Sequence, residues 1–151
     1  MNKLGLIFFL IVALGACKTM QKSSSSTPET EELKPLKADS YQLELTEIKN
    51  GNEVLDMEGK NILLIIDLEK NTYSGKSGCN SYFGKIEMTQ GNSYKFNVGG
   101  VTEMLCGQEV MQREARYLNA LVNHEFKISE KGKSVFFKGD DSSLTFTLKD
   151  E

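Results

Sequence analysis

Three cysteines and one histidine are the side chains of this protein most capable of covalent or metal chemistry. A cysteine thiolate can attack a substrate, bind a metal, carry a lipid or form a disulfide, and a histidine can exchange protons near neutral pH. The four residues are Cys17, Cys79, Cys106 and His124. Because an odd number of cysteines cannot all pair within one chain, at least one of them needs a separate role.

The segment before Cys17 is typical of an exported lipoprotein. Lys3 precedes an unbroken apolar run at residues 4–14, and two small residues follow the run. This is the layout of a secretory signal peptide. As a helix the run is about 16 Å long, which is too short for a hydrocarbon core of about 30 Å. The motif Leu14-Gly15-Ala16-Cys17 resembles the lipobox of bacterial lipoproteins, which implies cleavage of residues 1–16 and attachment of acyl chains such as palmitate to Cys17.

Residues 17–39 have the composition of a flexible, lipid-anchored tether. They contain four consecutive serines and both prolines of the chain, with few large apolar side chains. Such a segment cannot bury enough surface to offset the entropy of ordering it. Lys18 stands where an aspartate would resemble an inner-membrane retention signal. We therefore expect a lipid anchor in the outer membrane, with the domain facing either the periplasm or the cell surface.

The remaining segment, residues 40–151, shows mostly the pattern of β-strands. Tyr41, Leu43 and Leu45 alternate with polar residues, and a turn signal, Asn50-Gly51-Asn52, follows them. Further strands are predicted at residues 61–68, 72–76, 82–88, 93–98, 125–129, 134–138 and 143–148. Glycine and asparagine separate nearly all of these segments, as expected for strands joined by short turns.

One segment departs from the strand pattern and predicts an amphipathic helix from Gln108 to Asn123. Its predicted apolar face comprises Val110, Met111, Ala115, Tyr117, Leu118, Leu121 and Val122. A single helix between two groups of strands indicates an α+β domain. We therefore expect a curled, mainly antiparallel β-sheet packed around this one helix.

The charge distribution argues against nucleic acid as a partner. The chain has 18 basic and 21 acidic residues, a formal net charge of -3, and no long run of basic residues. One histidine excludes a histidine-rich metal cluster, and Asp140 and Asp141 lack the spacing of a calcium-binding loop. We expect no metal, no cofactor and a monomeric protein.

Three motifs, in the order in which they occur, resemble the META domain, the HslJ-like family. They are Gly78-Cys79-Asn80, the Thr-x-Met-x-Cys pattern of residues 102–106 and the Glu-x-x-x-Leu-x-x-Leu pattern of residues 114–121. The resemblance covers residues 41–149 and implies a small α+β fold with an antiparallel sheet around one helix. Tyr41 is expected to take the packing role of a tryptophan that is frequent in the family.

The META resemblance implies a binding or envelope role without catalysis. META domains occur in bacterial envelope proteins, often lipoproteins, and in proteins linked to heat shock, drug tolerance, secretion or motility. Glu103 stands where a basic residue is common in the family, so a ligand preference tied to that charge does not transfer to this chain.

Cys79 and Cys106 remain once Cys17 is assigned to lipid. An exported compartment favours a structural disulfide between them. Closing their loop stabilises a fold by about 3 to 4 kcal/mol in the chain-entropy model. Two buried free thiols and a redox-active pair are the alternatives, and the absence of a Cys-x-x-Cys arrangement disfavours the redox pair.

The other polar candidates have a structural interpretation beside a functional one. Asn80 and Thr102 are expected either to satisfy backbone groups in the loop near the cysteines or to line a ligand site. His124 could join a cysteine and Asn80 in a thiol-hydrolase set, but a position just past a helix favours an interaction with the last carbonyls. Gly75-Lys76-Ser77 lacks the first glycine of a phosphate-binding loop, so a tight turn explains it better.

Function is the least determined property of the sequence. We expect a non-enzymatic, lipid-anchored envelope protein that binds a protein partner or supports envelope integrity under stress. The alternative is a small-ligand-binding module. An aromatic binding surface formed by Tyr73, Tyr82, Phe83 and Tyr94 would favour ligand binding, although core packing is expected for at least half of these residues.

Overall fold

The computed structural model describes residues 36–149, which form nine strands and one helix. The strands are β1 (Ser40–Asn50), β2 (Glu53–Asp56), β3 (Ile62–Asp67), β4 (Thr72–Ser77), β5 (Ser81–Met88), β6 (Ser93–Val101), β7 (Glu125–Lys131), β8 (Ser134–Lys138) and β9 (Ser142–Leu148). The helix is α1 (Gln108–Leu121), between β6 and β7. The predicted signal peptide at 1–16, Cys17 and most of the tether lie outside the described residues. Within 36–149, no helix is long and apolar enough to cross a membrane.

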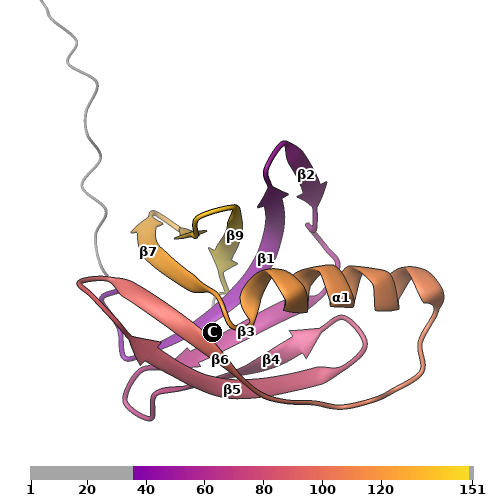
Figure 1. Ribbon diagram of the computed structural model, residues 1–151, viewed down its shortest axis with the longest axis horizontal. Coiled ribbons are helices and arrows are strands. Elements are labelled where there is room, and N and C mark those ends of the chain that lie inside the picture. The colour runs from indigo at the N-terminus through magenta and orange to yellow at the C-terminus, as the bar shows by residue number, and fades with distance from the viewer. Residues whose placement is uncertain (1–35, 150–151) are drawn as a thin grey trace, which may run out of the picture. The chain divides into compact units, whose positions relative to one another are not determined.

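The strands form an antiparallel sheet that closes on itself (Figure 1). Neighbouring strands follow the chain from β3 to β9, and β9 returns to pair with β1. β1 pairs on one edge with β3 and β2 and on the other with β9, over Leu43 to Asn50. β1 is therefore the seam of an eight-stranded barrel, and β2 extends from it as a short hairpin arm.

The expectation of an α+β sheet packed around a helix is wrong: the domain is mainly β. A sheet that closes into a barrel buries its inner face against itself and leaves no open edge, so it needs no helix to cover that face. Helix α1 buries only Glu114, Tyr117 and Leu121. The seven strand segments predicted after the first one are all present, together with β2, which the sequence pattern did not indicate.

The barrel interior is filled by alternate residues of the strands. In β1, Tyr41, Leu43 and Leu45 are buried, and a β-bulge between Leu45 and Glu47 shifts the phase so that Ile48 is the next buried residue. Four phenylalanines from the later strands complete the centre, with ring centroids of Phe137 and Phe146 4.7 Å apart. The four are Phe96, Phe126, Phe137 and Phe146, each with no exposed surface. The barrel is thus a packed core.

Two cross-strand pairs of glycine and tyrosine fill the wall between β4 and β5. Gly75 lies opposite Tyr82, and Gly84 lies opposite Tyr73. A Cβ atom on Gly75 would be 2.6 Å from the Tyr82 hydroxyl, and one on Gly84 would be 2.5 Å from the Tyr73 hydroxyl. These two glycines therefore make the space in which the tyrosine rings pack. Gly75-Lys76-Ser77 forms the end of strand β4, so the tight turn expected for these residues is wrong.

Candidate functional site

Helix α1 presents a carboxylate to the barrel where an apolar stripe was expected. Its buried residues are Glu114, Tyr117 and Leu121, which are spaced as neighbours on one helix face. Met111 and Ala115, predicted for the apolar face, are exposed. The spacing of three and seven residues from Glu114 to Tyr117 and Leu121 was the signal that could have located this glutamate, because it places all three on one face.

The Glu114 carboxylate binds the turn between β4 and β5. One of its oxygens accepts a hydrogen bond of 2.5 Å from the Ser77 hydroxyl and one of 2.8 Å from the Asn80 backbone N–H. The other accepts one of 2.6 Å from the Asn80 side-chain amide. Glu114 is 8% exposed and Ser77 1%. This group of bonds ties the helix to the turn at a site closed to most solvent.

These hydrogen bonds keep Glu114 ionised. Burial alone would raise the pKa of Glu114, but the hydrogen bonds from Ser77 and Asn80 outweigh that effect, and the net result is a lowered pKa. The ionised carboxylate is the acceptor that fixes Asn80.

Asn80, which Glu114 fixes, also binds the loop after β6. Its side-chain oxygen accepts hydrogen bonds of 3.0 Å from the Thr102 hydroxyl and 2.7 Å from the Met104 backbone N–H. The Thr102 hydroxyl oxygen in turn accepts a bond of 3.0 Å from the Ser81 N–H. Asn80 and Thr102, the two predicted loop or binding residues, thus lie together and satisfy backbone groups.

A disulfide joins the same turn to the same loop. Cys79 and Cys106 are bonded, with their Cα atoms 6.2 Å apart. Of the three alternatives for these cysteines, the structure has the disulfide. We call residues 102–107 the clamped loop, because the disulfide holds one end of it, and Asn80 holds Thr102 and Met104.

Two buried tyrosines lie on the inner side of this region. The hydroxyls of Tyr82 and Tyr117 are 2.6 Å apart, and the Tyr82 hydroxyl also donates to the backbone oxygen of Leu63 at 2.7 Å. Burial raises the pKa of both tyrosines. Both hydroxyls therefore stay protonated, and the two rings pack in the hydrophobic core. Tyr73 and Tyr94 are buried as well, and only Phe83 of the predicted aromatic group is exposed.

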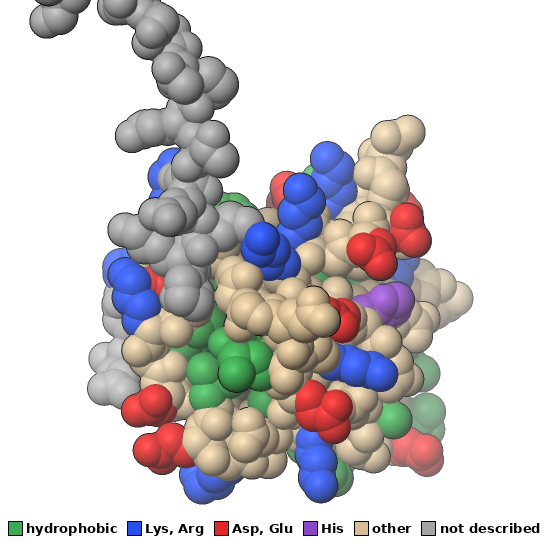
Figure 2. All heavy atoms as spheres, turned by 60° about the vertical axis from the view of Figure 1, so that its left-hand side comes forward, with side chains coloured by type: hydrophobic (Ala, Val, Ile, Leu, Met, Phe, Trp, Pro, Cys, Tyr) green, Lys and Arg blue, Asp and Glu red, His purple; other side chains and the backbone are tan. Residues whose placement is uncertain are grey.

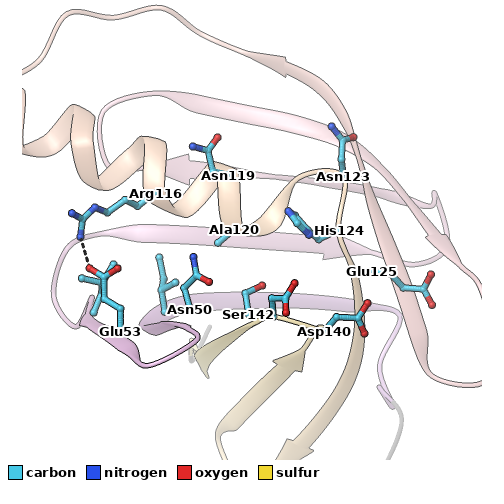
Figure 3. A pocket seen from close by; sticks show the side chains of 13 residues that line it. Asn50, Glu53, Arg116, Asn119, Ala120, Asn123, His124, Glu125, Asp140 and Ser142 are labelled. Carbon is cyan, nitrogen blue, oxygen red and sulfur yellow. Dashed lines mark hydrogen bonds and ion pairs between the residues drawn. The ribbon is translucent and has the colours of Figure 1, made fainter.

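The C-terminal half of α1 lines a separate cleft of about 530 Å³. Asn119, Ala120, Asn123 and His124 lie along one side of it, and residues of β1, β2 and the β8–β9 turn lie opposite (Figure 3). An ion pair of 3.3 Å between Arg116 and Glu53 closes one end. The remaining lining residues are Ile48, Asn50, Leu55, Glu125, Asp140, Asp141 and Ser142.

Several polar side chains of this cleft have no hydrogen-bond partner among the described residues. Within residues 36–149, the side chains of Asn50, Asn119 and Ser142 form no hydrogen bond, and neither does the imidazole of His124. Carboxylates outnumber cations in the lining, with Arg116 paired to Glu53. The cleft therefore offers donors and acceptors to a polar molecule, with the sides of Ile48 and Leu55 as its apolar part.

The structure does not assemble the thiol-hydrolase set considered from the sequence. His124 lies in the cleft, whereas Cys79 and Cys106 are bonded to each other and present no thiol. No group of three or more metal-binding side chains occurs in the part of the chain that the structure describes. Asp140 and Asp141 occupy the turn before β9.

The exposed apolar side chains of the described residues include two groups close to the barrel wall. Phe83 and Val98, 63% and 62% exposed, line a shallow hollow of about 360 Å³ on β5 and β6. On the clamped loop, Leu105 is 93% exposed and Met104 60%. On the face in view in Figure 2, hydrophobic side chains form a patch with charged side chains of both signs around it. The exposure of Phe83, Val98, Met104 and Leu105 makes the hollow and the clamped loop candidate contact surfaces.

The META domain family model matches residues 34–151. The chain belongs to the META domain family. No curated protein matches the chain. A structure solved by NMR, of a protein from Burkholderia xenovorans, is similar, with 25% identity and a TM-score of 0.62 over 75% of this chain and 84% of that one. Residues 34–151, which the family model matches, contain the whole barrel, the clamped loop and the cleft.

Proposed function

We propose that this META protein is a lipid-anchored component of the bacterial cell envelope whose barrel binds a protein partner without catalysis. The anchor is Cys17, placed after an apolar leader by the lipobox-like motif. In this proposal the protein is attached to the outer membrane and contributes to envelope integrity under stress. Several acyl chains on one cysteine hold a protein to a membrane stably, because each buried methylene contributes about 0.8 kcal/mol.

One observation supports binding over catalysis: the side chains best suited to catalysis are engaged in bonds that hold one loop in place. Glu114 accepts a hydrogen bond from Asn80, Asn80 accepts hydrogen bonds from the clamped loop, and both cysteines of the domain are joined in a disulfide. An active site needs a nucleophile, a base and a group that orients the base, with room for substrate among them. Here the corresponding side chains face each other and present a loop with exposed Met104 and Leu105.

The lipid anchor is tested by the intact mass of protein extracted from membranes. We expect a chain that begins at Cys17 and carries diacylglycerol and an amide-linked acyl chain. Substitution Cys17→Ser should release the protein from the membrane fraction. A chain that retains Met1 and has no added lipid mass would contradict the anchor.

Partner binding is tested by crosslinking in intact membranes followed by affinity purification. We expect one protein to be recovered reproducibly and to remain bound through washing in detergent. It should not be recovered from cells that lack the bait. A matched bait with Cys17→Ser shows whether the contact requires the membrane anchor. Recovery of only abundant proteins, equally with both baits and with an unrelated lipoprotein, would contradict partner binding.

A second candidate function is the binding of a small polar molecule, and the cleft favours it. The uncommitted Asn50, Asn119 and Ser142 lie around a volume large enough for a metabolite. A thermal-unfolding screen of polar metabolites tests this function, because a ligand at one hundred times its Kd stabilises the folded state by about 2.7 kcal/mol. A hit whose effect disappears in Asn119→Leu, while crosslinking returns no partner, would replace the first function with this one.

A further inference from the structure

The clamped loop places its most apolar side chains outside the barrel. Leu105 is 93% exposed, the highest value among the large hydrophobic residues of the described chain, and Met104 beside it is 60% exposed. Both lie in an irregular segment between β6 and α1. Adjacent aliphatic side chains that fold into no core stay available for contact with another molecule.

The backbone on both sides of this pair is nevertheless fixed. Thr102 N–H donates to the backbone oxygen of Ser81 at 2.9 Å, and Met104 N–H donates to Asn80 at 2.7 Å. Cys106 is held by the disulfide, and Gly107 then accepts the first bond of helix α1, from Met111. A loop that is already ordered loses little conformational entropy on binding, which favours affinity.

Charge indicates what the tip of the loop contacts. From Thr102 to Gln112 the chain has two carboxylates, Glu103 and Glu109, and no lysine or arginine. Glu109 is offset by Arg113 at 2.6 Å, so Glu103 supplies the net negative charge next to the apolar pair. This charge favours a partner with lysine or arginine at the rim of an apolar pocket.

The same charge disfavours two other occupants. An anionic lipid surface attracts basic segments, and this loop has none and has no tryptophan or tyrosine to sit at the interface. In a symmetric contact between two copies of the chain, each loop would face the other, and two Glu103 carboxylates would come together. A protein of different sequence is therefore the occupant that the loop fits.

We propose that the tip of the clamped loop, Met104 and Leu105 with Glu103, inserts into an apolar pocket with a basic rim on a partner protein. This inference rests on the proposed partner-binding function and names its surface. Glu114, Asn80 and the disulfide act as positioning groups, because they hold the loop and do not touch the partner.

The test uses the full-length protein in intact membranes, with a photoreactive amino acid in place of the exposed Gln108 beside the loop. The probe is combined with Leu105→Ser, Met104→Ser or Glu103→Lys. Val54→Ser is the matched control, because Val54 is also exposed, at 55%, but lies on β2. Melting temperatures of the purified variants confirm that each surface substitution leaves the fold intact.

We expect one protein adduct whose yield falls at least tenfold with Leu105→Ser, several-fold with Met104→Ser and several-fold with Glu103→Lys. Val54→Ser should leave it unchanged, and raising the salt should weaken it, because the rim contact is electrostatic. The inference would be overturned by adducts to lipid alone or to a second copy of the chain. It would also be overturned by a protein adduct whose yield is unchanged in Leu105→Ser.

The outcomes also separate this inference from the function on which it rests. If the general crosslinking experiment recovers a specific partner and the probe at position 108 does not capture it, the loop is not the docking surface, but partner binding stands. If neither experiment recovers a partner, both proposals fail.

Discussion

The two halves of helix α1 use similar residues in opposite ways. In the N-terminal half, Glu114 bonds to Ser77 and Asn80, and all three are buried. In the C-terminal half, Arg116 and Asn119 face a cleft where the side chain of Asn119 has no hydrogen-bond partner within residues 36–149. The first half holds a loop in place, and the second half leaves its polar groups open to solvent.

The difference shows that residue type alone does not identify a binding site. Asparagine, serine and glutamate occur at both places. At the buried N-terminal half they must bond to one another, because little water reaches them, whereas at the exposed cleft they can bond to water. A buried polar group that loses its partner costs free energy, whereas an exposed one bonds to water. Substitutions at the two halves should therefore differ greatly in their effect on stability.

The largest expected effect comes from removing the buried carboxylate. Glu114→Ala should lower the free energy of unfolding by about 4 kcal/mol, because it leaves the backbone and side-chain N–H donors of Asn80 without their acceptor and the Ser77 hydroxyl with the Asn80 carbonyl alone. Urea denaturation measures the change. Glu53→Ala is the matched control at the cleft, where an exposed ion pair contributes less than about 1 kcal/mol. Equal losses in the two variants would contradict the distinction drawn between the halves.

Removal of the disulfide should have the next largest effect. Cys79→Ser combined with Cys106→Ser should reduce stability by about 3 kcal/mol, because the unfolded chain gains the entropy of an open loop. Thermal unfolding of the oxidised protein and the double variant measures this. The control is the oxidised protein treated with a reductant, which should reach the same lower melting temperature. A double variant as stable as the oxidised protein would mean that hydrogen bonds alone fix the loop.

A smaller effect is expected at the outer layer of the same network. Thr102→Val keeps the shape of the side chain but removes the hydroxyl that joins Asn80 and Ser81, and should reduce stability by about 1 kcal/mol. Ser142→Ala in the cleft should change stability by less than about 0.5 kcal/mol. Hydrogen exchange of the Ser81 and Met104 amides in each variant locates the change. Faster exchange should appear at these amides in Thr102→Val and not in Ser142→Ala.

The smallest effect should be the dependence of stability on pH. The pKa of Glu114 is lower in the folded state than its ordinary value of 4.5, so the folded state releases this proton more readily than the unfolded state. The stability that results is fully present above the unfolded pKa and is lost as the pH falls through the folded pKa. It is a fraction of the Glu114→Ala effect, because a protonated carboxyl still accepts hydrogen bonds.

Measurement of unfolding from pH 6 to pH 2, in the unmodified protein and in Glu114→Gln, isolates this contribution. Glu114→Gln should show a shallower loss of stability in acid. If stability fell equally steeply with pH in both proteins, other carboxylates would account for the acid sensitivity. The ionisation of Glu114 would then contribute nothing to holding the clamped loop.

Much of the local structure was predictable from the sequence, and the closure of the sheet was not. Alternation at Tyr41, Leu43 and Leu45 follows from the two-residue period of a strand, and it indicates one buried face. The pairing of β1 with β9 joins residues about one hundred positions apart, and no local pattern encodes which strands meet. The expected sheet around a helix was wrong for this reason.

The candidate site was predictable in part. Asn80, Thr102 and the two cysteines were identifiable from their motifs, and they lie together. The role of Glu114 was missed, because a charged residue on a helix is normally assigned to the solvent face. Its place as the first residue of the third motif and its spacing to Tyr117 and Leu121 indicated otherwise. The cleft was also missed, since its residues come from segments far apart in the chain.

The sequence by itself determined the family, the strand segments other than β2, the helix and the identity of the polar residues near the cysteines. These are local properties, set by side-chain periodicity, turn residues and motif spacing. The tertiary structure alone decided that the sheet closes, that Glu114 is buried and that Leu105 projects from a fixed loop. Each of these depends on which distant residues exclude water from one another, and that is settled only when the whole chain packs.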